Sequence, residues 1–377
     1  MTISKGTVLT SIELFAGAGG LTEGFRQAGI QTLVANELHQ DASKTFRRNQ
    51  PDTDLITRDI HEVEAEEILA RSSSAVGYRI KPGDIDIVAG GPPCQGFSFA
   101  GAKEATDPRN QLVWQQIRLV AAIKPKFTII ENVEGMLKLY GGKMPSLIRT
   151  ELEKLGYKVE YRLLSAADYG VPQMRKRLFF LASRIGTPIF PMMTHCELPF
   201  EGYKKYVTVG EAIGDLDFLE AGELSTEYRL PPQTDFQRKM RGDSTVLYNH
   251  QASKHGERTI SYFSHMIPGG SIETIPPELL TKKTGIQRWH PERLSRAVVT
   301  AFEDFVHYRV NRIPTVREVA RLQTFPDHYE FLGQRTSGNQ NRKLKYSSQT
   351  QQVGNAVPPR MAAAIGNVLV TAALISK

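Results

Sequence analysis

The chain has 377 residues and a hydrophobic content of 40%, which is enough for a normal core and, by length, for two or three domains. Its two cysteines, Cys94 and Cys196, exclude a disulfide framework and suit a reducing cytosol. The sequence has no apolar signal core and no run of membrane-spanning length, so we expect a soluble, cytoplasmic protein with no membrane partner.

The net charge is +7, and its distribution is uneven. Residues 282–345 contain 13 Lys and Arg against six Asp and Glu, an excess equal to that of the whole chain. A face that binds a polyanion needs such an excess. An ordinary solvated surface can carry it as well, so charge alone leaves both interpretations open.

A strand, a glycine-rich turn and a helix open the chain. Residues 8–15 are apolar enough for a strand, Ala-Gly-Ala-Gly-Gly follows at 16–20, and an amphipathic helix is predicted over 21–29. This order is typical of a nucleotide-binding α/β fold. Thr22 stands where the diphosphate-binding pattern has its third glycine, so the turn favours a ligand without phosphates.

The next predicted strand, 31–35, ends at Asn36-Glu37. An acid at this distance from a glycine turn commonly accepts hydrogen bonds from ribose hydroxyls, which indicates an adenosine-containing cofactor. A purely structural acid at a strand end is the alternative. Asp59-Ile60 follows a further candidate strand and could reach the adenine.

A buried strand over 85–89 leads into Gly90-Gly91-Pro92-Pro93 and then Cys94. Ligands bind at the carboxyl ends of strands in such sheets, so Cys94 is a candidate nucleophile. The alternative is a small buried hydrophobe, which most free cysteines are. The polar loop 101–110 is long enough to be mobile.

After a helix over 111–123, a strand over 126–130 ends in Glu131-Asn132-Val133, at the same sheet edge as Cys94. Residues 157–165 and 178–183 alternate like antiparallel strands. Between them, Arg175 and Arg177 share one face if the segment is extended, and could contact an anion or a base carbonyl. A solvated charge run is the alternative.

From residue 186 to about 289 the periodicity fades and prolines rise, which indicates a second, irregular domain. Its His195, Cys196, His250 and His255 are too dispersed for a zinc site, so we expect no metal. Beyond it we predict helices over 314–325 and 361–375, with a polar, flexible tract at 333–345.

Together these motifs resemble the DNA cytosine-5 methyltransferase family, bacterial restriction–modification type. The resemblance is ordered and nearly full length. It is carried by Phe15–Gly20, Pro92–Gln95, Glu131–Val133, Gln173 with Arg175 and Arg177, Arg317–Gln323, and Gln352–Pro358. It implies an α/β fold with a mostly parallel, Rossmann-like sheet and a smaller, irregular target-recognition domain.

The resemblance implies S-adenosylmethionine as methyl donor and S-adenosylhomocysteine as product, in agreement with the incomplete phosphate pattern. Matched residue by residue, the cofactor site would comprise Phe15, Ala16, Gly17, Gly19, Glu37, Leu38, Asp59, Ile60, Pro93, Leu112, Asn355 and Ala356. Leu112 rests on the shortest motif.

The resemblance also implies the chemistry. The Cys94 thiolate would add to C6 of cytosine, and Glu131, protonated, would hydrogen-bond N3. Arg175 would hold the base O2 and support the geometry of the two, with Arg177 further out. No residue stands out as the base that removes the C5 proton, and a water could serve. The DNA contacts would include Gln95, Ser98 and Arg175.

We therefore expect a catalytic domain at 1–186, a target-recognition domain at 187–342 and a returning segment at 343–377. The expected partners are double-stranded DNA, with the target base flipped out, and a cognate restriction endonuclease; we expect a monomer. Three alternatives stay open: an RNA (tRNA) cytosine methyltransferase, a non-catalytic DNA-binding regulator, and a nicotinamide-dependent dehydrogenase, which leaves Pro-Pro-Cys-Gln unexplained.

Overall fold

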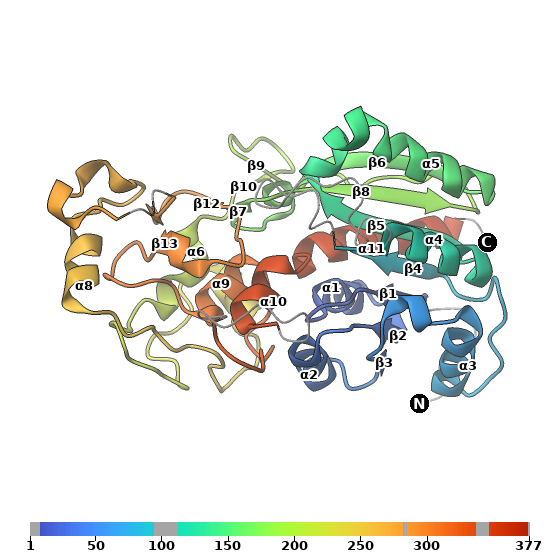
Figure 1. Ribbon diagram of the computed structural model, residues 1–377, viewed down its shortest axis with the longest axis horizontal. Helices are drawn as coiled ribbons and strands as arrows, with labels where there is room; N and C mark the ends of the chain where they lie inside the picture. Colours follow the sequence, from blue (N-terminus) through green and yellow to red (C-terminus); the bar gives the residue numbers. More distant parts are fainter. Residues whose placement is uncertain (1–7, 94–111, 282, 284, 337–346, 376–377) are drawn as a thin grey trace. The chain divides into compact units, whose positions relative to one another are not determined.

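The computed structural model describes residues 8–93, 112–281, 283, 285–336 and 347–375 (Figure 1). Cys94, Gln95, Ser98 and the loop 101–110 lie outside the described residues. By their contacts the residues divide into two compact units. The first comprises Met1–Ser165, Lys176–Met192 and Pro359–Lys377, and the second comprises Ala166–Arg175 and Met193–Pro358.

In the described part of the first unit, seven strands form one sheet. In order across the sheet they are β3 (Asp54–Ile56), β2 (Gln31–Asn36), β1 (Thr10–Leu14), β4 (Ile87–Gly90), β5 (Phe127–Val133), β8 (Lys176–Ser183) and β6 (Lys158–Ser165). The first five are parallel, and β8 is antiparallel to both β5 and β6. The prediction of an α/β fold with a mostly parallel sheet is confirmed.

The central strands are buried on both faces, which is why their sequences are continuous apolar runs. Ile87, Val88 and Ala89 of β4 are fully buried, as are Ile129 and Ile130 of β5. The chain order reverses between β1 and β4, because β2 and β3 lie on one side of β1 and β4 and β5 on the other. In open α/β sheets the ligand site lies at the carboxyl ends of the strands at such a reversal.

Helices connect and cover these strands. They are α1 (Gly20–Gln27), α2 (Gln40–Asn49), η1 (Ile60–Glu62), α3 (Ala65–Val76), α4 (Leu112–Ile123), η3 (Glu134–Gly142), α5 (Met144–Lys154) and α11 (Pro359–Ile375). The helices α3, α4 and α5 share one apolar core with the sheet, which includes Ile68, Val120 and Leu152. The sequence analysis had placed α1, α4 and α11 to within two residues at each end but had not placed α2, α3 or α5.

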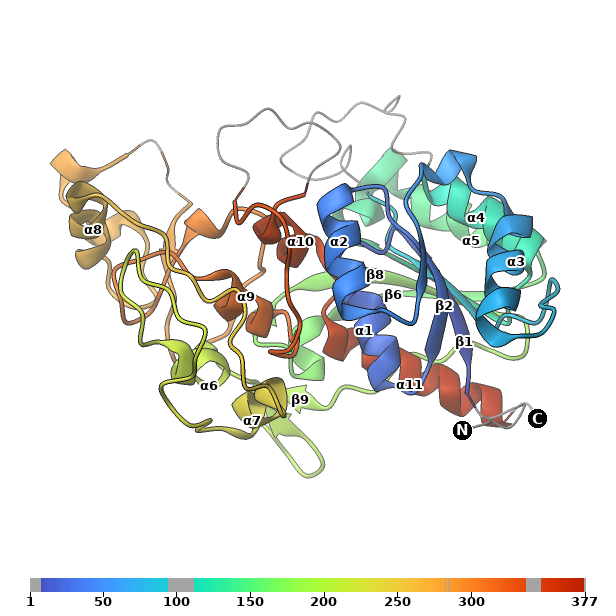
Figure 2. The same cartoon turned by 90° about the horizontal axis from the view of Figure 1, so that it is seen from below.

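The last helix packs along the first (Figure 2). A Cβ built on Gly24 of α1 would lie 2.4 Å from the Ala362 Cβ of α11, so only glycine permits this approach. The stretch Gln349–Ile375 is long and apolar enough to cross a membrane, and half of its most apolar window is buried. The packing on α1 is that of a core helix.

The second unit is built from short elements. They are η4 (Ala166–Tyr169), β7 (Gln173–Met174), β9 (His195–Cys196), β10 (Lys204–Lys205), α6 (Val209–Ile213), η5 (Gly214–Leu216), α7 (Asp235–Arg241), α8 (Glu257–Ser264), η6 (Ile272–Thr274), η7 (Pro277–Leu279), β11 (Gln287–Arg288), β12 (Ser295–Arg296), η8 (Phe302–Asp304), β13 (Phe305–Val306), α9 (Val316–Leu322) and α10 (Gln349–Asn355). The weak periodicity of its sequence thus corresponds to short, paired strands rather than to one large sheet.

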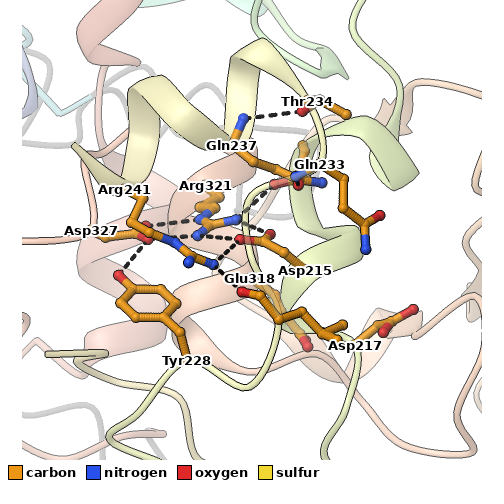
Figure 3. A network of polar contacts seen from close by, with 12 residues as sticks. Asp215, Asp217, Tyr228, Gln233, Thr234, Gln237, Arg241, Glu318, Arg321 and Asp327 are labelled. Carbon is orange, nitrogen blue, oxygen red and sulfur yellow. Dashed lines mark hydrogen bonds and ion pairs between the residues drawn. The ribbon is translucent and has the colours of Figure 1, made fainter. Parts of the chain in front are cut away.

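A buried ionic network stabilises this unit (Figure 3). Arg321 of α9 donates to Asp327 at 2.6 and 2.8 Å and also pairs with Asp215. Arg241 donates to Asp215 at 2.7 Å and lies over the Tyr228 ring, at 3.8 Å from its centroid. These charged residues come from segments that are distant in sequence, so the network holds those segments together in the fold.

The expected domain boundaries stay predictions, but three segments group differently from them. Residues 187–192, expected in the target-recognition domain, belong by contacts to the first unit. Residues 166–175 and 343–358, which the sequence analysis assigned to the catalytic domain and the returning segment, belong by contacts to the second unit. Hydrogen bonds of Gln352 help to hold residues 343–358 in the second unit, because its amide donates to the carbonyls of Leu332 at 2.9 Å and Ser347 at 2.8 Å.

Candidate active site

Three neighbouring strands of the first unit deliver the candidate site. Leu14, the last residue of β1, lies beside Gly90, the last residue of β4, and Gly90 in turn lies beside Ile130 of β5. The glycine turn and the segment that leads to Cys94 therefore leave the sheet at one edge, and Glu131 of β5 lies at this edge. This edge is the reversal of strand order identified above.

The glycine turn is held in a left-handed conformation. Phe15, Gly17 and Gly19 have φ values of 57°, 57° and 87°. For Phe15 such a backbone is uncommon, and it marks a position that the surrounding structure dictates. The Gly17 N–H points at the end of β2 and donates to Glu37 Oε2 at 2.8 Å.

Glu37 is oriented by three donors. Besides Gly17, its Oε1 accepts from the His39 N–H at 2.6 Å and contacts the His39 ring Nδ1 at 2.8 Å. The hydrogen bond to Glu37 raises the pKa of the His39 ring above its ordinary value. Between Glu37 and His39, Leu38 exposes 47% of its surface and provides an apolar face beside the acid. Acid and apolar side chain together suit a ribose with an attached base.

Asp59 and Ile60 begin the short helix η1. Asp59 accepts from the His61 N–H at 3.0 Å and contacts its ring Nδ1 at 2.7 Å. The first of these bonds is the main reason why the pKa of Asp59 lies below its ordinary value. Ile60 is buried. Both residues belong to the first unit, like the glycine turn and Glu37.

The sequence analysis missed the acid behind the glycine turn. Glu13 of β1 is buried and accepts a hydrogen bond from the Thr22 hydroxyl; the Thr22 backbone N–H also bonds to it. Burial raises the pKa of Glu13 to about 8. Gly19 offers no side-chain cap for α1, so Glu13 supplies the acceptor that the first turn of the helix needs. The sequence feature that could have indicated this contact is the presence of Glu13 and Thr22 on either side of the glycine turn.

The ends of β4 and β5 are joined by specific contacts. The Asn132 amide donates to the Pro92 carbonyl at 3.2 Å. A Cβ on Gly91 would lie 3.0 Å from Glu131 Oε2, so the segment leading to Cys94 passes directly beside the Glu131 carboxyl. Pro93, the last described residue before Cys94, is exposed.

Glu131 forms an ion pair with Arg177, with 3.0 Å between Oε1 and Nε. Glu131 of β5 lies opposite Phe179 of β8. Arg177 lies two residues before Phe179 on the same face of β8, so the side chains of Glu131 and Arg177 meet diagonally. Burial lowers the pKa of the Arg177 guanidinium. The expectation that Arg177 organises the site from further out stays a prediction, and the ion pair with the Glu131 carboxyl is compatible with it.

Arg175 has a different set of partners. It is 1% exposed and donates to the carbonyls of Val298 at 2.9 Å and Ala356 at 3.0 Å, all within the second unit. Gln173, two residues before it, accepts from the Val298 N–H at 2.9 Å. The two side chains thus bind the backbone N–H and C=O of one residue, Val298. The expectation that Arg175 holds the base O2 and supports the geometry of Cys94 and Glu131 stays a prediction.

The remaining predicted cofactor residues are distributed over both units. Leu112 begins α4 and packs against the core of the first unit. Asn355 ends α10 and Ala356 follows it, both in the second unit, where the Ala356 carbonyl is occupied by Arg175. Their part in a cofactor site remains a prediction.

Comparison with known proteins agrees with this geometry. The sequence profile of C-5 cytosine-specific DNA methylases matches residues 9–371. The type II methyltransferase M.DdeI of Desulfomicrobium norvegicum is 36% identical over 374 residues, covering 94% of this chain and 86% of its own. M1.HphI of Haemophilus parahaemolyticus is 36% identical over 368 residues, with 96% and 86% covered.

Solved structures are similar over nearly the whole chain. A putative DNA modification methyltransferase encoded within an E. coli prophage superposes with a TM-score of 0.75 at 25% identity, covering 96% of this chain and 99% of its own. A DNMT2 mutant of Spodoptera frugiperda gives a TM-score of 0.58 at 16% identity, with 96% and 99% covered, which shows a shared fold alone.

Proposed function

The chain belongs to the C-5 cytosine-specific DNA methylase family, and from this premise we propose how its residues methylate C5 of cytosine in a short duplex sequence. The observation that carries the proposal is the Glu131–Arg177 pair beside the Gly91–Pro93 segment. A carboxyl, a guanidinium and the approach to a cysteine converge there, as covalent activation of a pyrimidine requires.

We propose S-adenosylmethionine as the methyl donor. Glu37 would accept from the ribose hydroxyls, Leu38 would face the adenine, and Asp59 with Ile60 would bound it. The residues fit a ligand without phosphates, because the Thr22 N–H at the start of α1 already has Glu13 as its acceptor. When bound, this cofactor supplies an electrophilic methyl group on a sulfonium sulfur.

The remaining roles in the cofactor site follow the family match. Phe15, Ala16, Gly17 and Gly19 would line the site through the glycine turn. Pro93 and Leu112 would close it, and Asn355 with Ala356 would complete it. We also propose that Gln95 and Ser98 contact the DNA.

The chemistry that we propose begins with the Cys94 thiolate, which would form a bond to C6 of cytosine and make C5 nucleophilic. Glu131 would donate a proton to N3 as negative charge develops there, and Arg177 would orient the carboxyl and donate to O2. C5 would then take the methyl group, with S-adenosylhomocysteine as the leaving group. A water would remove the C5 proton, the C5–C6 double bond would re-form, the Cys94 sulfur would leave as thiolate, and the N3 proton would return to Glu131.

We propose duplex DNA as the partner, because C6 is inaccessible in a stacked base and must be flipped out. The basic stretch at 282–345 would contact phosphates, and base contacts would come from 187–300. A monomer in the cytoplasm, acting beside a restriction endonuclease of the same specificity, fits the type II methyltransferases that the chain resembles.

The test is methyl transfer from labelled S-adenosylmethionine into unmethylated duplex DNA, followed by bisulfite sequencing. We expect C5 methylation of one cytosine in a fixed context. Cys94→Ser should retain DNA binding and lose turnover. Methylation of tRNA in place of duplex DNA, or normal turnover by Cys94→Ser, would overturn the proposal.

A further inference from the structure

A buried glutamine lies beneath the two strand ends that carry the chemistry. Gln116 is in the middle of α4 and is fully buried, although Val113, Leu119 and Val120 on the buried side of the helix are apolar. Its amide Nε2 donates to the Ile129 carbonyl of β5 at 2.8 Å. One polar side chain thus reaches from the helix layer into the centre of the sheet.

The other end of this amide meets β4 and β1. A Cβ built on Gly90 would lie 2.7 Å from Gln116 Oε1 and 2.9 Å from the Leu14 carbonyl oxygen. Gly90 is therefore glycine because Gln116 and the end of β1 occupy the space of a side chain. The amide fills the junction at the reversal of strand order.

Both reactive groups of the proposed mechanism follow within a few residues of this junction. Cys94 comes four residues after Gly90, and Glu131 comes two residues after Ile129. Beyond the junction, the Gly91 backbone passes next to the Glu131 carboxyl, as described above. A shift of β4 against β5 at Gln116 would change the distance between the two groups directly.

Stability does not account for this glutamine. Its Oε1 is buried and no donor among the described residues reaches it. An unpaired buried acceptor is costly, and replacement by an apolar group of similar shape is commonly neutral or stabilising. A buried polar group without a hydrogen-bond partner lowers stability, and such groups are expected mainly at functional sites.

We propose that Gln116 is a positioning residue for methyl transfer: its amide fixes the carboxyl ends of β4 and β5 against each other and so sets the approach of Cys94 and Glu131 to the target base. The inference rests on the proposed function. It assigns to Gln116 no contact with the DNA or the cofactor.

The test compares Gln116→Met with Gln115→Met in the full chain. Methionine has nearly the same shape as glutamine but lacks the amide. Gln115 precedes Gln116 on the helix, is only partly buried and accepts from Arg118 Nε at 2.8 Å, so it controls for the substitution itself. The main readout is the rate of covalent adduct formation with duplex DNA that carries 5-fluorocytosine, which blocks loss of the C5 substituent and retains the adduct.

We expect Gln116→Met to slow adduct formation about 10- to 100-fold, the usual effect of misplacing reacting groups by a fraction of an ångström to 1 Å. Its melting temperature should equal or exceed that of the wild type, and its affinities for S-adenosylmethionine and DNA should stay within about twofold. Gln115→Met should match the wild type throughout.

Two outcomes overturn the inference. One is an adduct rate within twofold of the wild type. The other is a loss of rate accompanied by a lower melting temperature, which indicates a merely structural role. Gln116→Leu, which is also apolar and of similar size, is the second variant if Gln116→Met does not fold, and it should show the same slow rate at a melting temperature no lower than that of the wild type. If the wild type itself forms no adduct, the proposed function has failed rather than this inference.

Discussion

Glu131 and Arg177 lie 3.0 Å apart on two antiparallel strands, beside the Gly91 backbone. Arg175, two residues before Arg177 in the sequence, donates to the carbonyls of Val298 and Ala356. Their substitutions should therefore fail in different ways.

Arg177→Met should slow methyl transfer strongly in a protein that still folds. The substitution leaves the largely buried Glu131 carboxyl without its cation and removes the donor proposed for the base O2. We expect single-turnover methyl transfer to fall about 10²- to 10³-fold. Affinity for S-adenosylmethionine, measured by calorimetry, should stay the same. A rate within threefold of the wild type would contradict the proposed role.

Arg175→Met should instead destabilise the second unit. It leaves the buried Val298 and Ala356 carbonyls without their charged donor. We expect a loss of about 2–3 kcal/mol in the free energy of unfolding, measured with urea. If stability is unchanged and only the methyl-transfer rate falls, Arg175 contacts the base after all, and the original expectation stands.

Glu13→Gln should change the dependence of stability on pH. Burial raises the pKa of Glu13 from an ordinary 4.5 to about 8. Between these values the unfolded chain releases this proton and the folded chain keeps it, so the wild type loses up to about 1.4 kcal/mol per pH unit from this group as pH rises from 4.5 to 8.

The variant lacks this titration, so its stability relative to the wild type should rise steadily from pH 5 to pH 8 and level off above. Urea unfolding at four pH values checks this. Parallel stability curves for the two proteins would show that Glu13 is ionised in the folded state.

Arg321→Met should be the most destabilising of these substitutions. Arg321 holds down the pKa of Asp327 to about 2, and without it two buried carboxylates lose a cation (Figure 3). Breaking a buried pair costs about 3–5 kcal/mol. Arg238, which pairs with Asp235 on the surface, provides the control: Arg238→Met should cost under about 0.5 kcal/mol. Equal effects of the two would mean that the buried network does not stabilise the second unit.

The sequence was most informative where local pattern determines structure. The apolar runs that end at Gly90 and Ile130 could only be buried strands, so the shared edge of Cys94 and Glu131 followed from strand direction alone. The separation of Arg175 from Arg177 could not be predicted in this way. Period-two alternation places both on one face only if the strand includes both, and β8 starts between them.

The second unit was unpredictable for another reason. Asp215 and Arg321 pair across 106 positions, and no local period marks such a pair. Gln116 could not be singled out either, because it stands next to Gln115 in the sequence and both look like ordinary surface positions until the buried face of the helix is known.

The packing of α11 on α1 has a consequence for synthesis. The face of α1 that contains Gly24 and Phe25 is covered only by Ala362 and Gly366 of α11, which leave the ribosome after the whole second unit. A nascent or prematurely terminated chain must therefore hold this apolar face uncovered, and such surfaces recruit chaperones or aggregate. Truncation within the second unit should yield an insoluble fragment rather than a partly active enzyme.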